Sequence, residues 1–120
     1  MSERAIAVAD ARGVRIGVAV VDVRGEPIQQ DTMDGAPSAA PFVADAVAAG
    51  AATFQRPSGD RPGADVGAPV PRALTSVLPY RVLAVTGGLP AREGDRVVGG
   101  LGIAGPDRAV RQETAEAALG

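Results

Sequence analysis

The sequence predicts an α+β domain in which a five-stranded antiparallel sheet is flanked by helices. The predicted strands fall into two groups, residues 14–33 and 80–104, and the hairpin turns within each group are too short for a parallel crossover. A long Ala-rich helix separates the two groups, and a helical segment lies at each end of the chain. The length of 120 residues suits a single domain that spans residues 1–120.

The first elements are a helix and a strand pair. Residues 2–12 form a short helix, for which Ser2 is the predicted cap and Gly13 the stop. Residues 14–23 place apolar side chains on both faces, which predicts a central strand. The turn that follows is tight, so residues 27–33 return as its antiparallel neighbour.

The middle of the chain holds the long helix and a loop. Residues 34–38 break the second strand, and Ser38 is expected to cap a helix that runs to Phe54. The wide apolar surface of this helix indicates burial against a sheet or a partner subunit. Residues 56–71, which contain the repeat RPSGD and RPGAD, are typical of a flexible loop, and we expect a short helix at 72–78.

The last part supplies three strands and a helix. Residues 80–86 predict a strand, and residues 89–92 and 96–104 predict a hairpin around a Gly-containing turn. A proline then opens the last helix, at residues 106–119, with Asp107 favourably placed near its N-terminus.

Missing residue types exclude several kinds of site. The chain has no Cys and no His. This excludes a Cys/His zinc site, a disulfide and a Ser-His-Asp triad, and we expect no metal site. The formal net charge is -2 and the basic residues are scattered, which argues against nucleic acid as a partner. No apolar run approaches the ~20 residues of a membrane span, and the N-terminus has no leader pattern. We therefore expect a cytoplasmic protein that does not contact a membrane.

One glycine motif imitates a nucleotide site. Gly100, Gly102 and Gly105 match G-x-G-x-x-G between a predicted strand and a predicted helix. A dinucleotide fold also needs another parallel strand and an acidic residue ~20 positions later, and only fifteen residues follow Gly105. Gly100 and Gly102 fall on one face of the strand, where a helix or a ligand can approach closely, and we expect helix packing to be the reason for them.

Three stretches of the chain together resemble one family. They are VAVVDVRGEPIQQDTMDGA (18–36), AVAAGAATFQRPSGD (46–60) and GGLPAREGDRVVGGLGIAGP (87–106). In this order and spacing they resemble the GlcG/HbpS-type family, also called haem-degrading or DUF336-type domains. The resemblance covers most of the chain, and it implies a five-stranded antiparallel sheet with helices, assembled into dimers or larger homo-oligomers.

The resemblance also implies a ligand pocket near two turns, Asp34-Gly35-Ala36 and Gly87-Gly88-Leu89-Pro90. The family includes haem-binding and haem-degrading proteins and proteins of glycolate utilisation, so the ligand stays open. The chain departs from the family's pattern at three positions. Thr32 and Val47 stand where the family usually has Arg and Lys, and Arg111 stands where it usually has an acidic residue.

The first functional hypothesis is a binding module for a small organic molecule, with haem as the candidate that the resemblance supplies. Without His or Cys, iron could be ligated only by Tyr80, Met33, Met1, a hydroxyl such as that of Thr32, or a carboxylate, which weakens haem as the cofactor. Met33 is also the kind of side chain that fills a core. The predicted ligand-binding residues are Thr32, Met33, Gly35, Arg56, Arg81, Gly87 and Gly88.

The second hypothesis is a metal-independent isomerase, lyase or hydrolase acting on a small acidic metabolite. Asp34 lies on a tight turn before a helix, and Asp34 or Glu93 would act as the general base, with Tyr80 as the acid. Arg81 or Arg56 would hold the carboxylate of the substrate. The simpler interpretation makes Asp34 a turn or capping residue and Glu93 a solvated hairpin residue.

The third hypothesis is an accessory homo-oligomer that stabilises a neighbouring enzyme. Surfaces rich in Ala, Gly and Val suit close packing between subunits, which would be symmetric copies of this chain. The sequence leaves these three hypotheses open.

Overall fold

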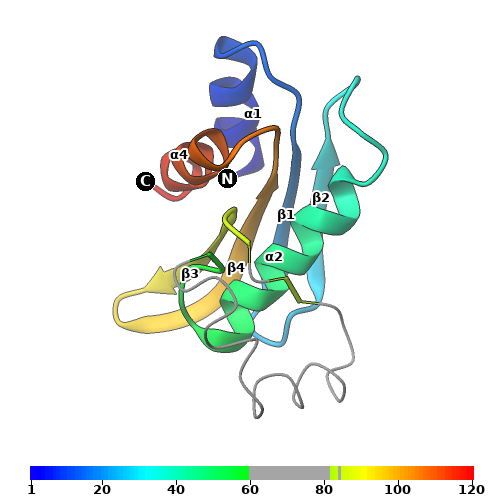
Figure 1. The fold of residues 1–120 in the computed structure, drawn as a ribbon. Helices are drawn as coiled ribbons and strands as arrows, with labels where there is room; N and C mark the ends of the chain where they lie inside the picture. The colour runs from blue at the N-terminus through cyan, green and yellow to red at the C-terminus, as the bar shows by residue number, and fades with distance from the viewer. Residues whose placement is uncertain (60–81, 84) are drawn as a thin grey trace.

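The computed structural model describes residues 1–59, 82–83 and 85–120. Its helices and strands are α1 (Ser2–Ala11), β1 (Gly17–Asp22), β2 (Pro27–Thr32), α2 (Ala40–Phe54), β3 (Gly88–Glu93), β4 (Arg96–Ala104) and α4 (Arg108–Leu119). Within the described residues, the strands form one antiparallel sheet in the order β2-β1-β4-β3, with helices on both faces (Figure 1). The predicted α+β class is confirmed, but the sheet formed by the described residues has four strands and not the predicted five.

The predicted strand that the described structure does not contain is the one at residues 80–86. The described residues of this segment belong to no strand. Instead, the backbone N–H of Leu83 donates to the carbonyl of Ala46 at 3.3 Å, so Val82 and Leu83 lie beside α2. A short apolar run looks the same whether it faces a sheet or a helix, which is why the sequence pattern misled here. The helix predicted at 72–78 lies outside the described residues.

Helix α2 packs on one face of the sheet by placing alanines against glycines. Ala44, Ala48 and Ala52 recur at a spacing of four on α2 and are buried. Gly100 and Gly102 of β4 face them, and a Cβ built on Gly102 would lie only 2.8 Å from the backbone nitrogen of Ala48. This confirms the prediction that close helix packing accounts for these two glycines.

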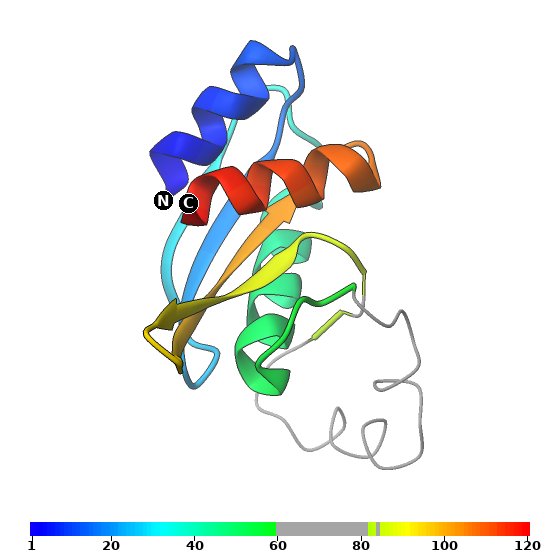
Figure 2. The same cartoon turned by 90° about the vertical axis from the view of Figure 1, so that its left-hand side faces the viewer.

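The opposite face of the sheet carries larger side chains and is covered by α1 and α4, which bring the two chain ends together (Figure 2). Strand β1 lies between β2 and β4 and is buried on both faces, as its apolar pattern predicts. The core on this side consists of Ala5, Ala9, Ile16, Val18, Val20, Leu89, Leu101, Ile103, Ala115 and Ala118.

Two of the predicted helix caps are wrong, and Asp107, predicted only to lie favourably near a helix N-terminus, makes a capping hydrogen bond. Ser2 lies inside α1 and is buried, because the helix begins directly after Met1. Ser38 lies in a turn outside α2 and makes no cap, and Ala39 holds the N-cap position. Asp107, by contrast, caps α4, since its carboxylate accepts a hydrogen bond from the Val110 N–H at 2.9 Å.

The loop predicted at residues 56–71 is described only as far as Gly59. Ser58 joins this part to β3, because its N–H donates to the Gly88 carbonyl at 3.0 Å and its Oγ accepts from the Gly88 N–H at 2.9 Å. Among the described helices, none is long and apolar enough to cross a membrane.

Candidate functional site

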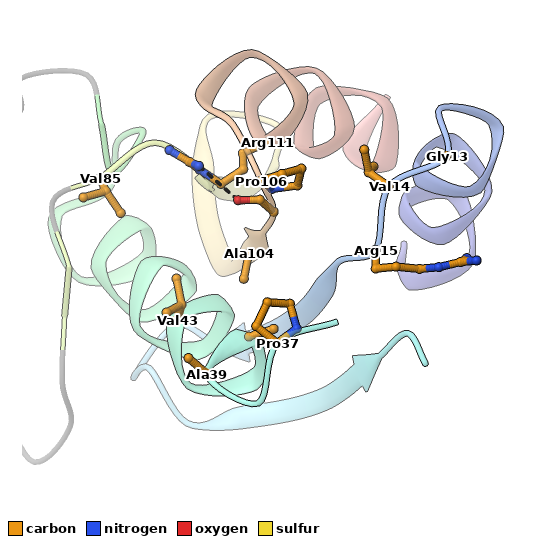
Figure 3. Close-up of a pocket in the computed structure, with 12 residues that line it drawn as sticks. Gly13, Val14, Arg15, Pro37, Ala39, Val43, Val85, Ala104, Pro106 and Arg111 are labelled. Carbon is orange, nitrogen blue, oxygen red and sulfur yellow. Dashed lines mark hydrogen bonds between the residues drawn. The ribbon is translucent and has the colours of Figure 1, made fainter. Parts of the chain in front are cut away.

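A cavity of about 580 Å³ opens at the end of the sheet where β1 and β3 begin and β4 ends (Figure 3). The strand register creates this end, because Gly17 pairs with Ala104 and Gly88 pairs with Gly102. The start of α2 and the chain segments next to these strand ends form the walls. The volume falls within the range of roughly 300–1,000 Å³ that is typical of small-molecule sites.

The wall of the cavity is almost entirely apolar. Small side chains at the start of α2 and at the end of β4 leave the space open, and prolines stiffen two of the adjoining segments. Such a surface favours an apolar ligand, since its burial removes apolar area from water. The apolar side chains of the lining are Val14, Pro37, Ala39, Ala40, Val43, Val85, Ala104 and Pro106.

Arg111 of α4 supplies a fixed positive charge at one end of the cavity. Its Nε donates to the carbonyl of Thr86 at 2.7 Å and its Nη1 donates to the carbonyl of Gly105 at 3.1 Å. Within the described residues, its Nη2 has no acceptor. The two backbone contacts hold the guanidinium in one orientation, so it needs little further ordering to bind an anion.

Arg15 lies at the opposite end of the lining, where its side chain is more exposed to solvent. In Figure 3 its side chain points away from Arg111, on the side of Gly13 and Val14. Its guanidinium is half exposed and pairs with Asp10 at 3.5 Å, which is a weak surface ion pair. The lining therefore consists of an apolar middle with the guanidinium of Arg111 at one end and the stem of Arg15 at the other, and the Arg15 guanidinium lies at the exposed rim.

The two turns that the family resemblance implies both flank the cavity. A Cβ built on Gly35 would lie 3.6 Å from Cγ of Arg15, and one built on Gly87 would lie 3.6 Å from Cδ of Arg111. Both glycines have positive φ, at 90° and 142°, where a side chain would strain the backbone. Each turn therefore supports the stem of one cavity arginine. A contact of Gly35 or Gly87 with a ligand stays a prediction.

The predicted catalytic carboxylates are not brought together. Asp34 is exposed on the turn after β2, at the cavity end of the sheet. Glu93 is exposed at the far end of β3, roughly 16 Å along the strand from Gly88. In this arrangement one ligand in the cavity would not contact both carboxylates, and the acid/base mechanism stays a prediction without geometric support. Tyr80, its predicted acid, lies outside the described residues.

The remaining predicted residues lie in different settings. Thr32 is exposed at the end of β2, whereas Met33 is half buried and packs against the core under α1 and α4. Gly88 is buried, and its Cβ would collide with the backbone of α2. Arg56 is half buried and lies four residues before the first residue that the structure does not describe. Arg81 lies outside the described residues.

Sequence reasoning missed both cavity arginines as binding residues. It singled out Arg111 only as a departure from the family's pattern, and it placed Arg15 on a predicted strand. One usable signal was the position of Arg111 four residues after the capping residue Asp107, on the first turn of a helix that follows a buried strand. Local patterns do not show that the two arginines meet at one cavity, since 96 positions separate them.

Two further observations concern chemistry. Among the described residues, no group of three or more His, Cys, Asp or Glu side chains could hold a metal ion. Outside the cavity, Asp45 of α2 has a carboxylate oxygen that is buried without a hydrogen-bond partner in the described part of the chain. Burial raises the pKa of this carboxyl above its usual value.

The fold and the cavity define a small antiparallel α+β domain with a ligand-sized site at one end of its sheet. Comparison of the sequence with protein-family profiles identifies the family of this domain. The chain belongs to the haem-degrading HbpS-like family, whose profile matches residues 1–120, and the predicted resemblance is thereby confirmed. No curated protein sequence matches the chain.

Solved structures of similar fold include several related proteins. The Klebsiella pneumoniae protein ORFY, of the DUF336 family, is 22% identical with a TM-score of 0.86, and the match covers 98% of this chain and 81% of that one. A haem complex of PduOC is 24% identical with a TM-score of 0.84, covering 98% and 86%. HbpS is 26% identical with a TM-score of 0.82, covering 98% and 83%.

Proposed function

We propose that this protein binds a small, largely apolar organic molecule that carries at least one carboxylate. The observation that supports this proposal is the apolar cavity with the guanidinium of Arg111 held at its end by two backbone carbonyls. The apolar lining would bury the body of the ligand, and Arg111 would pair with its carboxylate.

The expected energies make Arg111 the main polar contact. A hydrogen bond to a charged group contributes about 1.5–3 kcal/mol, and its value rises where water is excluded. Arg15 would contribute less, because it is exposed and must leave Asp10 to reach a ligand. Recognition is thus expected to rest on the lining and on one fixed cation, with a second cation available at the rim.

Family membership and the haem complex of PduOC make haemin the first ligand to test. The organic part of haemin suits the lining, since it combines a broad apolar surface with two carboxylates. The described lining offers no side chain that commonly ligates haem iron. We therefore propose an organic anion as the ligand class and regard haemin as one member of it.

The experiment is a haemin titration followed by visible absorption, with two variants that change different features of the cavity. Arg111→Met removes the charge and should weaken binding by about 10- to 100-fold. Val43→Phe fills the space beside α2 and should weaken binding through steric exclusion. The matched controls are Arg4→Met and Val98→Phe, which replace exposed residues outside the lining and should leave the dissociation constant unchanged.

Thermal melts of all variants separate binding from folding, because Arg111 also connects two backbone segments. Saturable binding that neither cavity variant weakens would contradict the proposed site. The absence of saturable binding to haemin and to other apolar carboxylates would contradict the proposed function.

A further inference from the structure

Among the residues that the structure describes, the cavity lining includes no good ligand for haem iron. Haem iron in proteins is held by His, Cys, Met or Tyr, and the sequence has no His and no Cys. The described lining contributes alkyl groups and two guanidinium groups. Arginine stays protonated and offers only N–H donors, so neither Arg15 nor Arg111 would ligate a metal.

The two methionines are also not placed to ligate an iron in the cavity. Met33 packs against the core cluster that α1 and α4 cover, and it is not part of the cavity lining. Met1 holds the N-cap position of α1, is half exposed, and also lies outside the lining. Moving Met33 to the cavity would open a core that is otherwise closely packed.

No carboxylate belongs to the described lining, and two carboxylates on segments next to it have partners. Asp107 accepts the Val110 N–H at 2.9 Å as the cap of α4. Asp10 pairs with Arg15 at 3.5 Å. Both carboxylates lie outside the described lining, and so does Asp34, which is exposed on a turn.

We infer that this cavity recognises the organic frame and the carboxylates of its ligand and not a metal ion at the ligand's centre. The inference rests on the proposed function and narrows it. Its consequence is that a metal-free tetrapyrrole with two propionates binds as tightly as haemin, since both offer the same apolar surface and the same anions to the two arginines.

The test compares haemin with metal-free protoporphyrin IX under identical conditions. Porphyrin fluorescence gives the dissociation constant of the metal-free ligand, and displacement of the porphyrin by haemin gives that of haemin at the same site. We expect the two constants to agree within about fivefold, which corresponds to about 1 kcal/mol. Arg111→Met should weaken both ligands by the same factor, and imidazole added to occupy the iron should not change the haemin constant.

The outcomes separate this inference from the proposed function. Haemin that binds more than about fivefold tighter than protoporphyrin IX would overturn the inference and leave the proposed function standing. Titration of Met33→Leu and Tyr80→Phe would then identify the iron ligand, through loss of the extra affinity. If neither tetrapyrrole binds, and other apolar carboxylates also fail, the proposed function falls together with the inference.

Discussion

Replacing Gly102 by alanine tests whether the close approach of α2 to the sheet determines the stability of this fold. Gly102 lies in the middle of the face that α2 covers, opposite Ala44 and Ala48. A Cβ at position 102 would overlap the carbonyl oxygen of Ala44, and it would lie 2.8 Å from the nitrogen and 2.9 Å from the Cβ of Ala48. These atoms belong mainly to helix backbone, which cannot rotate away as a flexible side chain can.

The magnitude follows from two opposing effects. Overpacking of a close-packed core costs about 1–3 kcal/mol, and the upper part of that range applies because backbone must move. Alanine also restricts the unfolded chain, which returns about 0.5–1 kcal/mol. The net loss of unfolding free energy is therefore about 2 kcal/mol. For a domain of this size we expect a fall of about 8 °C in Tm.

Urea denaturation followed by circular dichroism measures this change directly. The midpoint should fall at an unchanged slope, since the surface exposed on unfolding stays similar. Gly105→Ala is the matched control, because its Cβ would meet only the side chains of Ile16 and Arg111, at 3.3 and 3.4 Å. A Gly102→Ala protein as stable as the Gly105→Ala control would refute the argument that backbone contact at this position limits the fold.

Four further predictions address the caps, the charges and the surface. Asp107→Ala removes the cap of α4 and should cost about 1 kcal/mol of unfolding free energy in urea denaturation. Burial raises the pKa of Asp45, so the charged form of this carboxyl destabilises the fold at neutral pH. Asp45→Asn should therefore raise Tm at pH 7. The gain in Tm should vanish below pH 3.8, where the wild-type carboxyl is also neutral. Asp10→Asn frees Arg15 and should tighten haemin binding by up to about fivefold in a titration at low salt. The family resemblance implies a homo-oligomer, and Phe42 is 76% exposed on α2; native mass spectrometry should show an oligomer that Phe42→Asp dissociates, and a monomeric wild type would contradict this.

Most of the fold could be predicted because its elements have local signals. The alternation that predicts β1 as a central strand, and the tight turn that predicts β2 as its neighbour, depend only on residues close in the chain. The fifth strand failed for the opposite reason. The segment around Leu83 is apolar in either setting, and its hydrogen bond to Ala46 joins residues far apart in the sequence. Nothing in the local sequence distinguishes a strand in a sheet from a segment that contacts a helix.

The candidate site also has a part that local motifs predict and a part that they do not. Short motifs that carry the resemblance pointed to the two turns at Gly35 and Gly87, which lie beside the stems of Arg15 and Arg111, and a role of these turns in ligand binding stays a prediction. The sequence did not point to Arg15 and Arg111 as candidate binding residues, because Arg111 reaches the cavity only through the packing of α4 on the sheet, and Arg15 lies on the segment between α1 and β1. A motif can therefore point to turns beside a cavity, whereas the charge of Arg111 depends on how a helix far along the chain packs.

The departures from the family's pattern acquire a physical meaning in this setting. Position 47, where the resemblance leads one to expect Lys, holds a fully buried Val47 whose backbone packs against Gly88 of β3. A lysine there would place an unpaired charge in the core, which is strongly destabilising. Thr32, where Arg is expected, is exposed and lies outside the cavity lining. Arg111 instead brings a charge to the cavity from α4. Because a ligand's carboxylate must reach whichever element carries the cation, a ligand in this chain is expected to direct its anionic end toward α4 and not toward α2 or β2.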